Sequence, residues 1–238
     1  MKINKLFSIQ NKVCVITGGA GGIGNIIAKS IFDNRGKVII LDRKKNKKNK
    51  KNFEFIQCDL TNIEEQKKVI KYLKIKYKKI DAVINACGVS DEGSYINNIN
   101  TNLNAIYEIT KNIIPLMRKN SSVVNITSLN AEMGFSNNPG YNSSKGALKM
   151  LTKSFCVDYS YKGIRFNNIG PGYFRTSMTK KNFQNKKKRQ QRLQRIPMSR
   201  YGDPQELVGA TIFLISNGSS YITGQDIYVD GGFLAKGI

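Results

Sequence analysis

The stretch Lys12-Val-Cys-Val-Ile-Thr17 runs directly into Gly18-Gly19-Ala20-Gly21-Gly22-Ile23-Gly24, and it decides the fold. Its first six residues form a short apolar run that is typical of a buried strand. From Ile23 to Asn34 apolar residues recur at helical spacing until Gly36, which predicts an amphipathic helix. Glycines between a strand and a helix let the backbone approach a pyrophosphate at the helix N-terminus, whose free N–H groups favour an anion. We therefore expect a dinucleotide at this turn.

A second stretch, from Asn125 to Lys145, contains candidate catalytic residues. Ser128 follows an apolar strand, and Tyr141 and Lys145 are four residues apart, which places them on one face of a helix. A phenol with a pKa near ~10 is a poor acid–base group at neutral pH unless a positive charge favours the phenolate, and Lys145 can supply that charge. Ser128 could then hold a carbonyl or alcohol oxygen while Tyr141 transfers the proton. The Tyr–Lys spacing is also common in surface pairs, so this interpretation depends on the glycine turn.

These motifs, in this order and at this spacing, resemble the short-chain dehydrogenase/reductase family over essentially all 238 residues. Seven recurring strand–helix units agree with the fold that the resemblance implies, a single-domain α/β Rossmann fold (residues 1–238) with a doubly wound, seven-stranded parallel sheet. The implied activity is reversible hydride transfer between NAD(P)(H) and a secondary alcohol or ketone.

The resemblance implies a catalytic set of Ser128, Tyr141, Lys145 and Asn102. Asn102 would hold, through a local break in its helix, a water that links Lys145 to solvent. Asn100 and Asn104 are rivals for this role by proximity, and all three could be surface asparagines. About a dozen residues separate Gly88 from the helix that contains Asn102, fewer than expected for most members of the family, so one wall of the substrate cleft is expected to be short.

The resemblance also implies a cofactor site. Asp59, within an expected third strand over 54–60, would meet the adenine amino group. Asn85-Ala86-Cys87-Gly88 is a variant of the family's Asn-Asn-Ala-Gly turn, and Phe174 and Thr176 would hold the nicotinamide amide. The full expected set is Gly18, Gly22, Ile23, Gly24, Asp42, Asp59, Leu60, Asn85, Ala86, Gly88, Tyr141, Lys145, Pro171, Gly172, Phe174 and Thr176.

Two positions favour NAD(H) over NADP(H). Asp42 ends the expected strand Lys37–Asp42, where a carboxylate would accept hydrogen bonds from a ribose and repel a 2′-phosphate. Members that prefer NADP often carry an arginine within the glycine turn, at the place that Gly21 occupies here. Arg43 opens a basic tract and could reach a phosphate, although a solvated lysine-rich loop is the simpler interpretation.

The resemblance implies that the basic segment over about 174–202 forms a lid over the cleft, where it would determine which substrate binds. It carries ten Lys and Arg residues from Arg175 to Arg200, which suits an anionic substrate or, equally, a solvated helix. The C-terminal Asp-Gly-Gly-Phe-Leu-Ala-Lys-Gly and the Asn-Ile-Thr-Ser stretch are most similar to gluconate-type sugar-acid dehydrogenases. A 3-oxoacyl-carrier-protein reductase that uses NADPH is the alternative. An alternative of another class is a non-catalytic cofactor-binding or nucleic-acid-binding protein.

Composition excludes several classes of site. The chain contains no histidine, which rules out Ser-His-acid triads and His-ligated metals, and we expect no metal.

The location and partners of the protein are also suggested by composition. Four scattered cysteines, a polar N-terminus and the lack of an apolar run near ~18 residues predict a cytoplasmic protein without a membrane span. The formal charge of +23 could attract nucleic acid, but Lys-, Asn- and Ile-rich codon bias explains it more simply. Relatives suggest a homotetramer.

Overall fold

Seven parallel strands form one sheet within the residues that the computed structural model describes, 2–44, 53–176, 179 and 184–236. The strand order is β3-β2-β1-β4-β5-β6-β7. The first three strands are added toward one edge of the sheet, and β4 returns to the other side of β1, so the order of strand addition reverses between β1 and β4. In such a sheet, ligands bind at the carboxyl ends of the strands near this reversal. The predicted doubly wound fold is confirmed. The strands are β1 (Val13–Thr17), β2 (Lys37–Asp42), β3 (Glu54–Gln57), β4 (Ile80–Asn85), β5 (Met117–Ile126), β6 (Arg165–Pro171) and β7 (Asp226–Val229).

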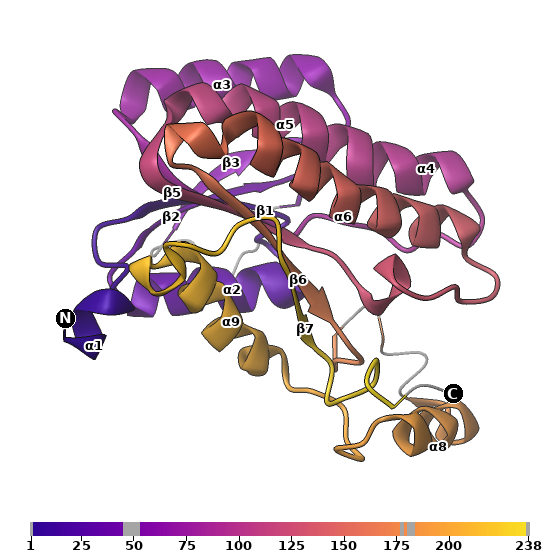
Figure 1. Ribbon diagram of the computed structural model, residues 1–238. Coiled ribbons are helices and arrows are strands. Elements are labelled where there is room, and N and C mark those ends of the chain that lie inside the picture. Colours follow the sequence, from indigo (N-terminus) through magenta and orange to yellow (C-terminus); the bar gives the residue numbers. More distant parts are fainter. Residues whose placement is uncertain (1, 45–52, 177–178, 180–183, 237–238) are drawn as a thin grey trace.

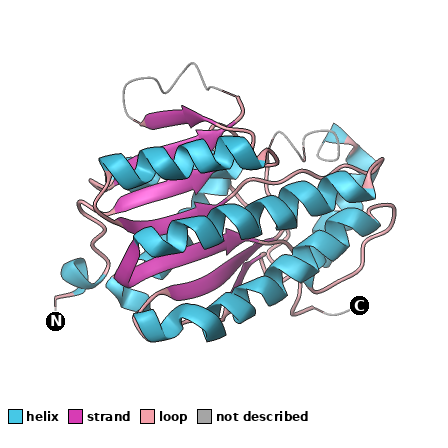
Figure 2. Ribbon diagram, turned by 90° about the horizontal axis from the view of Figure 1, so that it is seen from above, coloured by secondary structure: helices cyan, strands magenta, loops and turns pink. Residues whose placement is uncertain are grey.

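Helices cover both faces of the sheet. Figure 1 shows α3 (Ile63–Lys76), α5 (Ala105–Ile113) and α6 (Pro139–Tyr159) on one face, and α2 (Gly22–Asp33) and α9 (Leu207–Ile215) on the other. In Figure 2 the three helices of the first face lie in front of the sheet. Alternation along the strands builds both cores, since Val13 and Val15 pack under the first set of helices and Cys14 and Ile16 under the second.

Short elements complete the described chain. They include α1 (Ile3–Leu6), α4 (Tyr95–Ile99), a π-helical segment (Asn100–Asn104) and α8 (Lys186–Arg195). The remaining 3₁₀ turns are Ile114–Leu116, Leu129–Ala131, Ser160–Lys162, Pro204–Glu206 and Asn217–Ser219.

The structure corrects one expected boundary. The third strand ends at Gln57 and not at Leu60, because the Asp59 N–H binds the Glu65 carboxylate at 2.7 Å and the Asp59 carboxylate binds Thr61. Farther along the chain, a capping box between Asp203 and Glu206 begins the 3₁₀ turn that leads into α9.

All four cysteines are free thiols, and Cys14 and Cys58 are buried. In the described ranges, no group of three or more Cys, Asp or Glu side chains is placed to hold a metal ion. None of the described helices combines the length and apolarity needed to span a bilayer. The basic lid is only partly visible, because 177–178 and 180–183 lie outside the described residues.

Candidate active site

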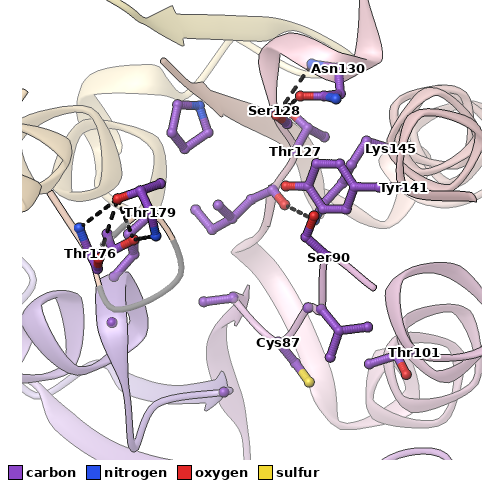
Figure 3. A pocket seen from close by; sticks show the side chains of 18 of the residues that line it. Cys87, Ser90, Thr101, Thr127, Ser128, Asn130, Tyr141, Lys145, Thr176 and Thr179 are labelled. Carbon is purple, nitrogen blue, oxygen red and sulfur yellow. Dashed lines mark hydrogen bonds between the residues drawn. The ribbon is translucent and has the colours of Figure 1, made fainter. Parts of the chain in front are cut away.

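A cavity of about 520 Å³ opens at the carboxyl ends of the strands. Its wall includes the glycine turn, the loop after β4, the end of β5, the start of α6 and the segment after β6. Figure 3 shows Ser128, Tyr141 and Lys145 on one side of this space and Thr176 and Thr179 on another. The volume falls in the range of ~300–1,000 Å³ that small-molecule and cofactor sites occupy.

The glycine turn is shaped to hold a phosphate group. Gly18 has φ +67°, and a Cβ there would lie 2.7 Å from the backbone of Cys87, so this position requires glycine. A Cβ at Gly24 would lie 2.4 Å from the Gly18 carbonyl oxygen, which explains the close packing of α2 against the turn. At Gly21 and Gly22, by contrast, an added Cβ meets nothing within 4 Å, and both residues line the cavity. The open cradle at the N-terminus of α2 therefore fits a dinucleotide pyrophosphate.

Asp42 lies at the end of β2 and faces the same cavity. Its carboxylate accepts hydrogen bonds from the N–H groups of Ala20, at 3.1 Å, and Lys44, at 2.9 Å. These bonds fix the carboxylate beside the glycine turn. Arg43, which is exposed, also lines the cavity here.

The adjacent wall comes from the loop after β3. Asp59 and Leu60 both line the cavity. Hydrogen bonds from the hydroxyl and N–H of Thr61 lower the pKa of Asp59, so its carboxyl is ionised at neutral pH.

Tyr141 lies in the first turn of α6, which begins after the N-cap residue Asn138. Burial raises the pKa of Tyr141, and a hydrogen bond with the Ser128 side chain opposes that rise. Ser128 is fixed in turn by Asn130, whose N–H donates to the Ser128 hydroxyl at 3.2 Å and whose Oδ1 accepts from it at 3.0 Å. The two predicted residues therefore meet in the cavity.

Lys145 is buried one helical turn after Tyr141. Its Nζ donates to the carbonyl of Ile126 at 2.8 Å and lies 5.7 Å from the centre of the Tyr141 ring. Burial lowers the pKa of Lys145 to about 8, which leaves the amine mostly protonated at pH 7. The ammonium is thus fixed between the end of β5 and the tyrosine ring.

Asn102 lies behind the cavity wall, in the π-helical segment between α4 and α5. This segment confirms the predicted local break in the helix. The Asn102 side chain is fully buried and binds Val89 and Ser144. Its rivals Asn100 and Asn104 are exposed and bind each other at 3.0 Å.

Two of the residues expected to bind cofactor, Gly24 and Asn85, lie outside the cavity lining. Asn85 belongs to a row of polar residues that pair in register across five neighbouring strands: Thr17, Asn85, Asn125, Asn168 and Asp226. The Asn85 amide donates to Asn125 at 2.8 Å and to Thr110 at 2.9 Å. Asn85 thus contributes to the sheet beneath the turn, while Ala86 and Gly88 line the cavity.

The expected nicotinamide end follows β6. Pro171, Gly172, Phe174 and Thr176 all line the cavity. A Cβ at Gly172 would lie 2.6 Å from Asp230 Cα, so the close approach of the C-terminal segment requires glycine. The Thr176 N–H donates to the Thr179 hydroxyl at 3.0 Å, which closes a small turn (Figure 3).

The structure adds residues that sequence reasoning missed. Ser90 and Asn138 line the cavity and are joined by a 2.6 Å hydrogen bond. Asn138 could have been found, because an Asn directly before Pro139 is a helix-start signal. No comparable pattern marks Ser90, Asn130 or Thr179.

Comparison with known proteins agrees with this geometry. A family model described as Enoyl-(Acyl carrier protein) reductase matches residues 18–234. The 5-keto-D-gluconate 5-reductase of Escherichia coli K12 is 33% identical over 98% of this chain and 99% of its own length. The chain belongs to the short-chain dehydrogenase/reductase family. It is therefore an NAD(P)-dependent oxidoreductase of this family.

Other members of the short-chain dehydrogenase/reductase family match over nearly the whole chain. The 3-oxoacyl-[acyl-carrier-protein] reductase of Thermotoga maritima is 32% identical over 95% of this chain and 99% of its own. A solved structure of an NAD(P)-dependent gluconate 5-dehydrogenase from Beutenbergia cavernae, described as putative and with bound NADP, superposes with a TM-score of 0.89 at 26% identity, covering 97% and 99% of the two chains. These relatives leave the substrate and the choice between NAD and NADP open.

Proposed function

We propose that this oxidoreductase interconverts a secondary alcohol and a ketone on an anionic sugar or sugar acid, with NAD(H) as the preferred cofactor. The observation that carries the proposal is the meeting of Ser128, Tyr141 and Lys145 in a cavity whose other end is the glycine turn and Asp42. A phenol, a hydroxyl and an ammonium at one end of a dinucleotide-sized cavity suit proton transfer to a carbonyl oxygen.

In this mechanism each residue has a distinct role. The nicotinamide, when bound, supplies or accepts the hydride. The Ser128 hydroxyl donates a hydrogen bond to the substrate oxygen, and the Tyr141 phenol gives its proton to that oxygen in reduction or takes it in oxidation. The Lys145 ammonium favours the phenolate against the opposing effect of burial and would hold the nicotinamide ribose. Asn102, at the break in its helix, serves the proton relay from Lys145 to solvent.

Replacing Tyr141 with Phe tests this assignment. Loss of the proton-transfer group should lower kcat by roughly 10²–10⁴-fold while the NADH dissociation constant stays within about threefold. Turnover is measured by NADH absorbance, and NADH binding by fluorescence titration. Tyr95→Phe is the matched control, because Tyr95 is 52% exposed. Retained turnover in Tyr141→Phe would remove the assignment.

The preference for NAD(H) is supported by the Asp42 carboxylate and by the open position at Gly21. A carboxylate beside the adenosine ribose repels a 2′-phosphate. We expect kcat/KM to be higher with NADH than with NADPH, and Asp42→Ala to reduce this difference. Arg43→Ala provides the comparison, because it removes the neighbouring cation that would favour a phosphate. Unlike Asp42→Ala, it should not reduce the preference for NADH. A wild-type preference for NADPH would contradict the proposal.

The alternative function is that of a 3-oxoacyl-carrier-protein reductase that uses NADPH. It is supported by the 32% identity to the Thermotoga maritima reductase. A screen of sugar acids and β-ketoacyl thioesters with both cofactors distinguishes the two functions. Membership of an oxidoreductase family favours an enzyme over the non-catalytic cofactor-binding or nucleic-acid-binding alternative.

Assembly as a homotetramer is part of the same proposal. Met150 and Val157 on α6 are 59% and 82% exposed, and Tyr95 and Ile96 on α4 are 52% and 63% exposed. Such apolar side chains on helices suit a contact with further copies. Light scattering on wild type and Val157→Glu tests it, with a smaller assembly expected for the variant. The cytoplasmic location stays a prediction.

A further inference from the structure

The basic segment after β6 places one of its described cations in the cavity wall. Among the described Lys and Arg side chains between Arg175 and Arg200, the one that lines the cavity is Arg192 on α8. Arg200 is neutralised by Glu206, with two hydrogen bonds of 2.6 and 2.7 Å. Arg195 lies over the ring of Phe233, 5.7 Å from its centre. The lid therefore presents a specific guanidinium to the site, and not only a general positive charge.

Arg192 is held in place by an aromatic side chain. Its guanidinium carbon lies 4.8 Å from the ring centre of Tyr173, which is within the range of a cation–π contact. Tyr173 is itself packed edge-on against Phe233, with ring centres 5.3 Å apart. The ring centre of Tyr201 lies 5.9 Å from that of Tyr173. Because the contact with Tyr173 already restricts its side chain, Arg192 would lose less side-chain entropy on binding a ligand than a free surface arginine.

The position of Arg192 relates it to the substrate end of the cavity. Tyr173 directly follows Pro171 and Gly172 at the end of β6, and β6 neighbours β5, which leads to Ser128. The residues expected to hold adenosine, Asp42 at the end of β2 and Asp59 after β3, lie toward the opposite edge of the sheet. Arg192 is therefore nearer the substrate end of the cavity than the adenosine end.

The end of α8 is attached to the C-terminal segment. Ile196 is 2% exposed and packs with Phe233, and the Met198 N–H donates to Gly231 at 3.1 Å. Figure 1 shows α8 beyond the ends of β6 and β7. These contacts fix the helix that places Arg192 in the cavity wall.

The charge of Arg192 is available to a ligand. In the part of the chain that the structure describes, no carboxylate lies within ion-pair distance of Arg192. The cavity also contains Ser90, Asn130 and Asn138, whose hydroxyl and amide groups suit a polyhydroxylated ligand, and the exposed carboxylate of Glu92, which can accept from hydroxyls.

We propose that Arg192, supported by Tyr173, binds the carboxylate of a sugar-acid substrate and so selects sugar acids over neutral sugars. This inference rests on the proposed function and names the residue that would determine its specificity. The planar guanidinium binds a carboxylate with two parallel hydrogen bonds, which a lysine ammonium cannot reproduce. A neutral sugar of the same shape leaves that interaction unmade.

The test uses two ketones that differ at one group, 5-keto-D-gluconate, which has a carboxylate, and L-sorbose, which has a hydroxymethyl group there. Arg192→Gln should raise the KM for 5-keto-D-gluconate about 10- to 100-fold, the loss expected for a charge-assisted hydrogen-bond pair. Its kcat/KM for L-sorbose and its NADH dissociation constant should stay within about threefold. Arg192→Lys should recover part of the loss. Arg195→Gln, one turn away on the same helix, should leave both ketones unaffected.

Each other outcome is decisive. Equal losses on both ketones would show a structural role, and a weaker NADH affinity would show that Arg192 binds the cofactor; either result overturns the proposal. If the wild type reduces neither ketone, the proposed substrate class fails, and the binding of D-gluconate and D-glucitol to the NADH-loaded protein is compared by calorimetry. Tighter gluconate binding that Arg192→Gln abolishes would support the anchor, and its absence would overturn it.

Discussion

The buried side chain of Asn102 pairs with both backbone groups of Val89, accepting from its N–H at 2.8 Å and donating to its carbonyl at 2.9 Å. The same amide also donates to the Ser144 hydroxyl at 3.0 Å. Asn102 therefore joins the loop after β4, which lines the cavity, to α6, which carries Tyr141 and Lys145. A relay role for Asn102 would act in addition to this structural one.

Replacing Asn102 with Ala should cost about 1–3 kcal/mol of unfolding free energy, because buried groups of Val89 and Ser144 lose their partner. The KM for cofactor should also rise, since Val89 lines the cavity. Urea denaturation and steady-state kinetics measure the two effects. Asn104→Ala is the control, because Asn104 is exposed in the same π-helical segment, and it should change neither quantity. Equal effects of the two variants would contradict this account.

The glycine turn predicts a difference between two Gly→Ala variants. Gly18→Ala should destabilise the fold by about 1–3 kcal/mol, because the position combines φ +67° with a Cβ contact of 2.7 Å to backbone. Gly21→Ala should stay within about 0.5 kcal/mol of wild type, since the added Cβ meets nothing within 4 Å. Thermal unfolding of the two cofactor-free variants makes the comparison. A Gly18→Ala variant as stable as Gly21→Ala would show that the turn can relax.

Lys145 predicts a pH dependence of stability. Folding lowers its pKa from 10.5 to about 8, so between these values the unfolded chain binds more protons than the folded one. The contribution of Lys145 to the free energy of unfolding therefore increases as the pH rises through this window. Relative to the wild type, Lys145→Met should lose up to about 3 kcal/mol of stability between pH 7 and pH 10, because one pKa unit corresponds to ~1.4 kcal/mol.

Urea denaturation of the cofactor-free proteins at several pH values measures this difference. Lys153→Met is the control, because Lys153 is an exposed lysine on the same helix. A difference between Lys145→Met and wild type that does not change with pH would contradict the burial of a titrating amine.

An ion pair between Lys149 and Glu132 joins α6 to the loop that contains Ser128. Lys149, on α6, forms an ion pair with Glu132, and its Nζ lies 3.6 Å from Oδ2 of Asp226. The Tyr228 hydroxyl donates to the Glu132 carboxylate at 2.6 Å. Glu132 follows the 3₁₀ turn that begins after Ser128, so these contacts attach the Ser128 loop to α6 and β7. Glu132 and Lys149 are positioning residues in this account.

Lys149→Met should lower kcat by about 10-fold, because small displacements of a substrate-positioning group are costly. Stability should change by less than about 1 kcal/mol, as for other partly exposed ion pairs. Single-turnover rates and urea denaturation separate the two effects, and Lys153→Met again provides the control. A loss of stability without a change in kcat would assign the ion pair to the fold alone.

The sequence by itself determined the local features. The apolar run before the glycine turn, the helix after it and the four-residue spacing of Tyr141 and Lys145 are set by short-range periodicity. Gly18 was predictable for the same reason, since the tight turn between a strand and a helix is a local requirement. Together with the recurring strand–helix units and the resemblance to the family, these features predicted the doubly wound sheet and the end of the strands at which the candidate residues lie.

Only the tertiary structure decided which distant residues meet. It selected Asn102 over Asn100 and Asn104, because burial against Val89 and Ser144 depends on how the π-helical segment packs. It placed Asn85 in the polar row of the sheet, because that row depends on which strands are neighbours and on their register. It also brought Arg192 alone among the described lid cations to the cavity, because α8 packs on Tyr173 and the C-terminal segment. A charge count along the chain carries no information about such contacts, since they form only after the strands and helices have assembled.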